Sequence, residues 1–100
     1  MDTIKKLEII IEKRDLQKVL DILEELSVPQ YYVLKDVTGK DAKGIKHGDD
    51  LNDVFKNCIV TTITKAYLIT KIKVRMNEVF TKWSGICIVY SNVEEVSDIL

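Results

Sequence analysis

The residues best suited to chemistry gather in one polar segment, DVTGKDAKGIKHGDDLND, which spans residues 36–53. This segment holds three of the four glycines, the only histidine, five aspartates and three lysines. A G-x-x-x-x-G pattern occurs in it as GKDAKG, but Ile45 stands where a phosphate-binding P-loop has lysine. Its aspartates also lack the spacing of an EF-hand calcium loop. The segment therefore offers glycine and both signs of charge without a known catalytic or metal-binding motif.

The two cysteines and the histidine do not form a reactive or metal-binding group in the sequence. Cys58 and Cys87 lie in the apolar runs NCIVTTI and GICIVY, where a thiol usually behaves as a small buried side chain. There is no C-x-x-C pair, and a single histidine cannot build a zinc site. Paired carboxylates and an activated nucleophile are also missing. We therefore expect neither an enzyme nor a metal site.

Length and composition limit the class of protein. One hundred residues with 46% apolar content and a net charge of -1 predict a single domain over residues 1–100. Because the charge is balanced, the surface offers no attraction to nucleic acid. No apolar run approaches the length of a membrane span, and the N-terminal charges do not suit a signal peptide. These features predict a cytoplasmic protein that neither binds nucleic acid nor inserts into a membrane.

Hydrophobic periodicity predicts six elements in the order strand, helix, strand, strand, helix, strand. They cover residues 7–12, 16–26, 31–37, 57–63, 65–82 and 86–90. This order is typical of the α+β ferredoxin-like fold, a four-stranded antiparallel sheet with two helices on one face. Right-handed crossovers would place strands 7–12 and 57–63 in the centre. The two cysteines would then lie on strands that are not neighbours, beyond disulfide reach.

Several residues are predicted to mark the helix boundaries. Asp15 and Thr64 are expected to cap the two helices, and Ser27 and Pro29 are expected to end the first one. Asn92 is expected to cap a last short helical turn in VEEVSDIL.

The strands carry apolar residues on both faces, although the helices are expected to cover only one. The second face would then remain exposed in a single copy. We therefore expect the protein to assemble so that neighbouring sheets cover each other.

Four segments together resemble the nitrogen-regulatory PII and PII-like signalling proteins. These are KKLEIIIE (5–12), L-x-x-V-L-x-x-L (16–23), YYVLKDVTGK (31–40) and SGICIVYS (84–91). The resemblance covers nearly the whole chain and keeps the order of elements. It implies a homotrimer with the sheets inside, and a T-loop at about residues 38–56 that docks on a membrane transporter or metabolic enzyme. The branches linked to bicarbonate uptake and carboxysomes look nearer than the nitrogen-sensing branch.

The resemblance also implies a small effector in the clefts between subunits, usually an adenine nucleotide. AMP, ADP, ATP and cyclic AMP are the candidates, and bicarbonate is a further one. The candidate ligand-binding residues are Gly39 and Lys40 at the T-loop base and Lys82, Trp83, Ser84 and Gly85 after the second helix. The lysines would supply positive charge, Ser84 and the Gly85 amide hydrogen bonds, and Trp83 either a stacking face or packing. Candidate partner contacts in the T-loop are Lys43, Gly44, Lys46, His47, Asp49 and Asp50.

Two departures from the family pattern leave an alternative open. Gln30 and Tyr32 stand where family members have a Gly-x-Thr that meets the nucleotide. The loop after the second helix is also short, TKWSG, so triphosphate binding is in doubt. The alternative is a trimeric scaffold that has lost nucleotide binding and binds its partner constitutively.

Overall fold

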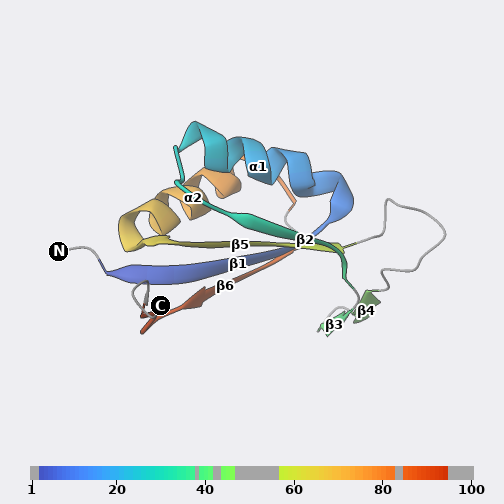
Figure 1. Ribbon diagram of the computed structural model, residues 1–100. Helices are drawn as coiled ribbons and strands as arrows, with labels where there is room; N and C mark the ends of the chain where they lie inside the picture. Colours follow the sequence, from blue (N-terminus) through green and yellow to red (C-terminus); the bar gives the residue numbers. More distant parts are fainter. Residues whose placement is uncertain (1–2, 38, 42–43, 47–56, 83–84, 95–100) are drawn as a thin grey trace.

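The structure is a computed structural model that describes residues 3–37, 39–41, 44–46, 57–82 and 85–94 (Figure 1). Its strands are β1 (Ile4–Glu12), β2 (Tyr32–Val37), β3 (Gly39–Asp41), β4 (Gly44–Lys46), β5 (Asn57–Lys65) and β6 (Ile86–Tyr90). Its helical elements are the 3-10 turn η1 (Lys13–Asp15) and the α-helices α1 (Leu16–Glu25) and α2 (Ala66–Val79).

Four of these strands form one antiparallel sheet in the order β2-β5-β1-β6. The two helices lie on the same side of this sheet (Figure 1). The arrangement confirms the predicted ferredoxin-like fold, with the first strand and the strand after the T-loop in the centre. Cys58 on β5 and Cys87 on β6 are separated by β1, and both are free thiols.

The core lies between the sheet and the helices, and it follows the alternation of the strands. β1 contributes Leu7, Ile9 and Ile11, which are at most 2% exposed. The other buried apolar residues are Leu16, Val19, Ile22, Leu23, Val28, Cys58, Val60, Ile69, Ile72 and Met76. Leu20 on α1 and Leu26 directly after it are partly buried and pack against this core.

The opposite side of the sheet, which we call the open face, also carries many apolar side chains. By strand register it comprises Ile4, Lys6, Glu8, Ile10, Glu12, Tyr32, Leu34, Asn57, Ile59, Thr61, Ile63, Lys65, Ile86, Ile88 and Tyr90. An apolar row crosses all four strands, because Leu34 pairs with Ile59, Ile59 with Ile10, and Ile10 with Ile86. Tyr32 and Leu34 are 68% and 62% exposed, which is unusual for side chains of their size in a sheet.

The end of α1 confirms the predicted stop and shows how it is made. Ser27 adopts a positive φ of 55°, and its amide donates to the Glu24 carbonyl at 3.0 Å. The Val28 amide donates to the Leu23 carbonyl at 3.0 Å, and Val28 itself is buried. These two bonds and the buried side chain form a Schellman motif, which satisfies the last carbonyls of the helix.

Both predicted N-caps were wrong. Asp15 makes no capping hydrogen bond, because η1 holds its backbone at φ -94° and ψ -5° instead of the extended geometry of a cap. Thr64 belongs to β5, which continues to Lys65, and its side chain is buried. Lys65 precedes α2 in extended geometry without a side-chain cap. α2 ends at Val79 instead of at the predicted residue 82, because Phe80 is extended and packs against the core.

The predicted C-terminal turn, residues 93–100, lies outside the described residues from 95 onward. Its proposed cap, Asn92, has φ 58° instead of the extended geometry of an N-cap, and neither Val93 nor Glu94 is helical. Neither α1 nor α2 has the length and apolar character that crossing a membrane requires.

Candidate functional site

The first part of the candidate site is the T-loop base, where β2 and β5 separate at one end of the sheet. Val37 pairs with Asn57, and the Asn57 side-chain amide donates to the Val37 carbonyl at 3.5 Å. Asn57 is only 3% exposed, although it is polar. It therefore ties the two strands together where the T-loop leaves them. The sequence signal for this role is weak, a single polar residue at the start of an apolar strand.

A β-bulge lies directly before this tie. The pairing of β2 with β5 shifts between Lys35 and Val37, with Asp36 at the bulge. Asp36 has φ 59°, a conformation that non-glycine residues seldom adopt. Such a bulge bends the strand and so sets the direction in which the chain enters the T-loop. Neither the bulge nor its position was predicted.

Cys58 lies beneath the bulge and is fully buried. Burial raises the pKa of the Cys58 thiol above its ordinary value, and a hydrogen bond with the Asp36 backbone opposes this in part. The thiol is therefore protonated and unreactive at neutral pH.

Inside the T-loop, β3 and β4 pair with each other as a short antiparallel ribbon. Its register joins Gly39 to Lys46, Lys40 to Ile45 and Asp41 to Gly44. The ribbon lies beyond the end of β2, away from the helices (Figure 1). Four of the predicted site residues therefore lie on strands instead of in an irregular loop, namely Gly39, Lys40, Gly44 and Lys46. Lys43, His47, Asp49 and Asp50 lie outside the described residues.

The second part of the candidate site is the turn between α2 and β6. Lys82 is exposed and Gly85 is partly buried, whereas Trp83 and Ser84 lie outside the described residues. Ile86, the first residue of β6, pairs with Ile10, which in turn pairs with Ile59 near the start of β5. The turn and the T-loop base therefore lie at the same end of the sheet.

These two parts are nevertheless separated within one chain. The T-loop base lies on the β2–β5 side of the sheet, and the turn leads into β6 on the far edge. Three strand spacings of about 4.8 Å put roughly 14 Å between β2 and β6. One copy thus offers two half-sites instead of one enclosed pocket.

A cavity of about 410 Å³ opens at the opposite end of the sheet. It is lined by Ile4, Ser27, Pro29, Gln30, Ile63, Thr64, Lys65, Tyr67 and Leu68. The Gln30 carbonyl accepts a hydrogen bond of 2.6 Å from the buried Thr62 hydroxyl, which holds this end of β2 in place. The predicted site did not include this cavity, since its residues come from three separate segments. Gln30, noted above as a departure from the family pattern, is one of them.

A smaller cavity of about 200 Å³ lies between α2 and β6. Lys73, Met76, Asn77 and Cys87 line it. Burial raises the pKa of the Cys87 thiol, and the nearby Lys73 opposes this in part. Among the described residues, no group of three or more histidine, cysteine or acidic side chains could hold a metal ion.

Comparison with solved structures identifies the fold. CPII, a nitrogen regulatory PII-like protein from Thiomonas intermedia K12, aligns with a TM-score of 0.76 at 24% identity, over 87% of this chain and 83% of that one. That structure contains ADP, AMP and bicarbonate. A PII-like signalling protein from Thermus thermophilus aligns with a TM-score of 0.68 at 20% identity, over 89% and 88% of the two chains. A DUF3240 family protein from Shewanella baltica OS155 aligns with a TM-score of 0.74 at 13% identity, over 97% of this chain and 98% of that one.

Comparison of sequences identifies the family. No curated protein matches the chain. The family model for nitrogen regulatory protein P-II matches residues 4–99, which include every element described above. The chain therefore belongs to the nitrogen regulatory protein P-II family.

Proposed function

We propose that the protein is a homotrimeric regulator in the cytoplasm. It binds a small effector between its subunits and acts through its T-loop on a membrane transporter or a metabolic enzyme. One observation carries the proposal: in a P-II family chain, residues 39–41 and 44–46 of the T-loop pair with each other as a ribbon separate from the main sheet, away from the helices. A segment held outside the core in this way is available to a partner protein.

The proposed effector is an adenine nucleotide, with bicarbonate as a second ligand. CPII, which shares the fold, contains ADP, AMP and bicarbonate. The two half-sites at the T-loop end of the sheet support a site between subunits. Since they stand about 14 Å apart in one chain, a second copy would have to complete each of them.

The residues of the two half-sites suit an anion. Lys40 on β3 and Lys82 after α2 would supply positive charge to a phosphate or to bicarbonate. Gly39 would allow the ligand to approach the backbone. Ser84 and the Gly85 amide would donate hydrogen bonds, and Trp83 would provide a stacking face for a base.

A thermal-shift panel of AMP, ADP, ATP, cyclic AMP and bicarbonate tests the effector. A ligand that binds only the folded protein adds about 2.7 kcal/mol at a hundred times its dissociation constant, enough to raise the melting temperature visibly. For the ligand that does so, Lys40→Ala and Lys82→Ala should each weaken affinity by about tenfold, because each removes a charge-assisted contact. Lys18→Ala is the control, since Lys18 is exposed on α1 and lies over the Phe80 ring.

Affinity unchanged in both variants would place the effector elsewhere. The cavity at the other end of the sheet is the next candidate, and Tyr67→Ala, which removes an aromatic side chain from its wall, would then reduce affinity.

Gln30 and Tyr32 favour a second candidate, the constitutive scaffold. Tyr32 is 68% exposed on the edge strand β2, and Gln30 lines a cavity where the family pattern has a small residue. Limited proteolysis around Lys40–Lys46 separates the two candidates. Protection that appears only with nucleotide supports the effector-controlled regulator, whereas a rate that no nucleotide changes supports the scaffold.

A further inference from the structure

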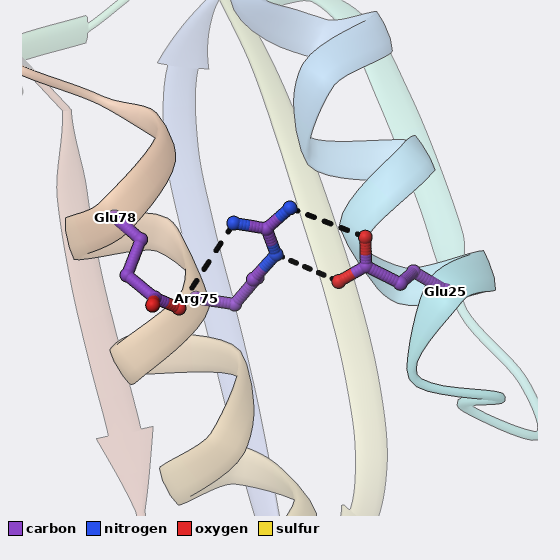
Figure 2. A network of polar contacts seen from close by, with 3 residues as sticks. All are labelled: Glu25, Arg75 and Glu78. Atoms are coloured by element: carbon purple, nitrogen blue, oxygen red, sulfur yellow. Dashed lines mark hydrogen bonds and ion pairs between the residues drawn. The ribbon is translucent and has the colours of Figure 1, made fainter.

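The two arginines of the chain, Arg14 and Arg75, have different surroundings. Arg75 donates hydrogen bonds from two of its nitrogens to Glu25, and its third nitrogen lies 3.9 Å from Glu78 (Figure 2). Its guanidinium is therefore fully engaged by carboxylates. Arg14 contacts Glu12 with its Nε atom, 2.9 Å from Oε2, and its side chain is 59% exposed. The two terminal amino groups of Arg14 are therefore open to a ligand.

Glu12 keeps Arg14 in place by charge. The Glu12 side chain is 18% exposed, and its Oε2 atom is fully buried and accepts no hydrogen bond from the described residues. A buried carboxylate oxygen without a hydrogen bond is destabilising, and the nearby guanidinium charge offsets part of this penalty. Moving Arg14 away would leave the oxygen uncompensated. Arg14 is therefore held at one position, although its contact with Glu12 lacks the geometry of a hydrogen bond.

Arg14 lies between the two half-sites of the candidate site. β1 ends at Glu12, which pairs with Asn57 at the T-loop base. On the other edge of β1, Ile10 pairs with Ile86, the residue that follows the turn after α2. Since β1 is the strand between β5 and β6, it stands about 10 Å from β2 and about 5 Å from β6. Arg14 follows β1 in η1, so it lies at the T-loop end of the sheet, within the roughly 14 Å that separate the half-sites.

Arginine recognises an anion differently from lysine. A lysine ammonium supplies a point charge, as proposed for Lys40 and Lys82, whereas a guanidinium donates two parallel hydrogen bonds to a planar or phosphate oxyanion. We propose that Arg14 binds an oxyanion of the effector through its two terminal amino groups. The inference rests on the proposed function, which supplies an effector at this end of the sheet. The oxyanion is a nucleotide phosphate or bicarbonate, since both carry two acceptor oxygens on one atom.

Isothermal titration calorimetry of the full chain with ADP and with bicarbonate tests the inference. Arg14→Gln should weaken affinity for at least one of them by about tenfold or more, because it removes a charge-assisted pair of hydrogen bonds. Loss for ADP alone assigns the phosphate, and loss for bicarbonate alone assigns bicarbonate. Arg14→Lys keeps the charge without the planar fork, so its loss should be about threefold. Arg75→Gln is the matched control and should leave both affinities unchanged, since Arg75 joins the two helices on their outer surface.

A second variant separates binding from folding, because Arg14→Gln leaves the buried Glu12 carboxylate without its partner. Arg14→Gln combined with Glu12→Gln removes both charges, and it should bind as weakly as Arg14→Gln alone. The difference from wild type should shrink as salt is raised from about 0.05 to about 0.5 M, because ions screen a contact between charges. Unchanged affinity for both ligands in Arg14→Gln and in the double variant would overturn the inference, and it would leave the proposed site intact if Lys82→Ala still weakens binding. A wild type that binds neither ADP nor bicarbonate would overturn both the inference and these proposed effectors.

Discussion

At the scale of single residues, the ends of the strands are held by polar atoms that bond to backbone carbonyls. The Thr62 hydroxyl donates to Gln30, and the Asn57 amide donates to Val37, so both ends of β2 are tied to β5. Thr62 and Asn57 are buried, where an unpaired polar atom would be costly. These bonds keep the T-loop base and the larger cavity at fixed positions relative to the core.

Ser27 is a residue whose backbone limits stability. It holds φ 55° at the end of α1, a conformation that glycine adopts without the steric cost of a Cβ atom. Ser27→Gly should raise the free energy of unfolding by about 0.5–1 kcal/mol in a urea titration at fixed protein concentration. Ser91→Gly is the control, because Ser91 is not among the residues with positive φ. An increase of the same size in the control would contradict this explanation.

The two thiols should differ in reactivity. Burial raises the pKa of both, so neither should react quickly with an aromatic disulfide reagent at pH 7.5. Cys87 is partly exposed beside a cavity and should react first, whereas Cys58 should react at least about tenfold more slowly, because the T-loop base must open. Cys58→Ser and Cys87→Ser assign the two phases. A reaction of Cys58 as fast as that of Cys87 would show that the base is open in solution.

At the scale of elements, α1 and α2 are joined on their outer surface by one arginine (Figure 2). The Arg75 guanidinium lies 2.7 Å and 3.3 Å from the two carboxylate oxygens of Glu25, and 3.9 Å from Glu78. The hydrogen bond with Arg75 lowers the pKa of Glu25 below its ordinary value of 4.5.

This pair predicts a pH dependence with a definite sign. Since the folded pKa of Glu25 is lowered, its contribution is complete above about pH 4.5 and is lost as pH falls through the folded value. Glu25→Gln should therefore melt slightly below wild type at pH 7, by about 2 °C, with the difference vanishing near pH 2. Glu78→Gln, which removes only the longer contact, should show a smaller difference. A Glu25→Gln difference that grows toward low pH would refute the assignment.

The elements also show how far the sequence could predict this protein. The β-branched and aromatic runs were enough to predict the four strands of the sheet, and the right-handed crossover rule was enough to place β1 and β5 in its centre. Thr64 was misassigned because threonine suits both a strand and a helix cap, and only the pairing of Lys65 with Ile4 decides between them. The β3–β4 ribbon was not predicted, since glycine, lysine and aspartate are poor strand formers.

The sequence suggested some residues of the candidate site but not the features that depend on strand pairing. The family resemblance placed Gly39, Lys40, Lys82 and Gly85, and the structure brings them to the same end of the sheet. The Asp36 bulge and the Asn57 tie depend on which strand lies opposite, which no local pattern records.

At the scale of the whole molecule, the two apolar faces of the sheet separate folding from assembly. The helices cover one face, and the apolar row through Ile10 and Ile59 remains on the other. Ile59→Lys should leave the fold intact and give single chains at micromolar concentrations where wild type is assembled. Val74→Lys is the control, since Val74 is 55% exposed on α2. Equal sedimentation of Ile59→Lys and wild type would mean that copies do not meet on this face.

The strand order has a consequence for the way the chain is made. β1 is complete at Glu12, yet the strands on its two sides, β5 and β6, end at Lys65 and Tyr90. During synthesis this central strand therefore emerges long before either of its neighbours exists. A nascent chain that has reached the T-loop exposes β1 along both edges, where it can pair with other unfinished chains. We expect translation pauses within the T-loop to lower the soluble yield more than pauses after Tyr90.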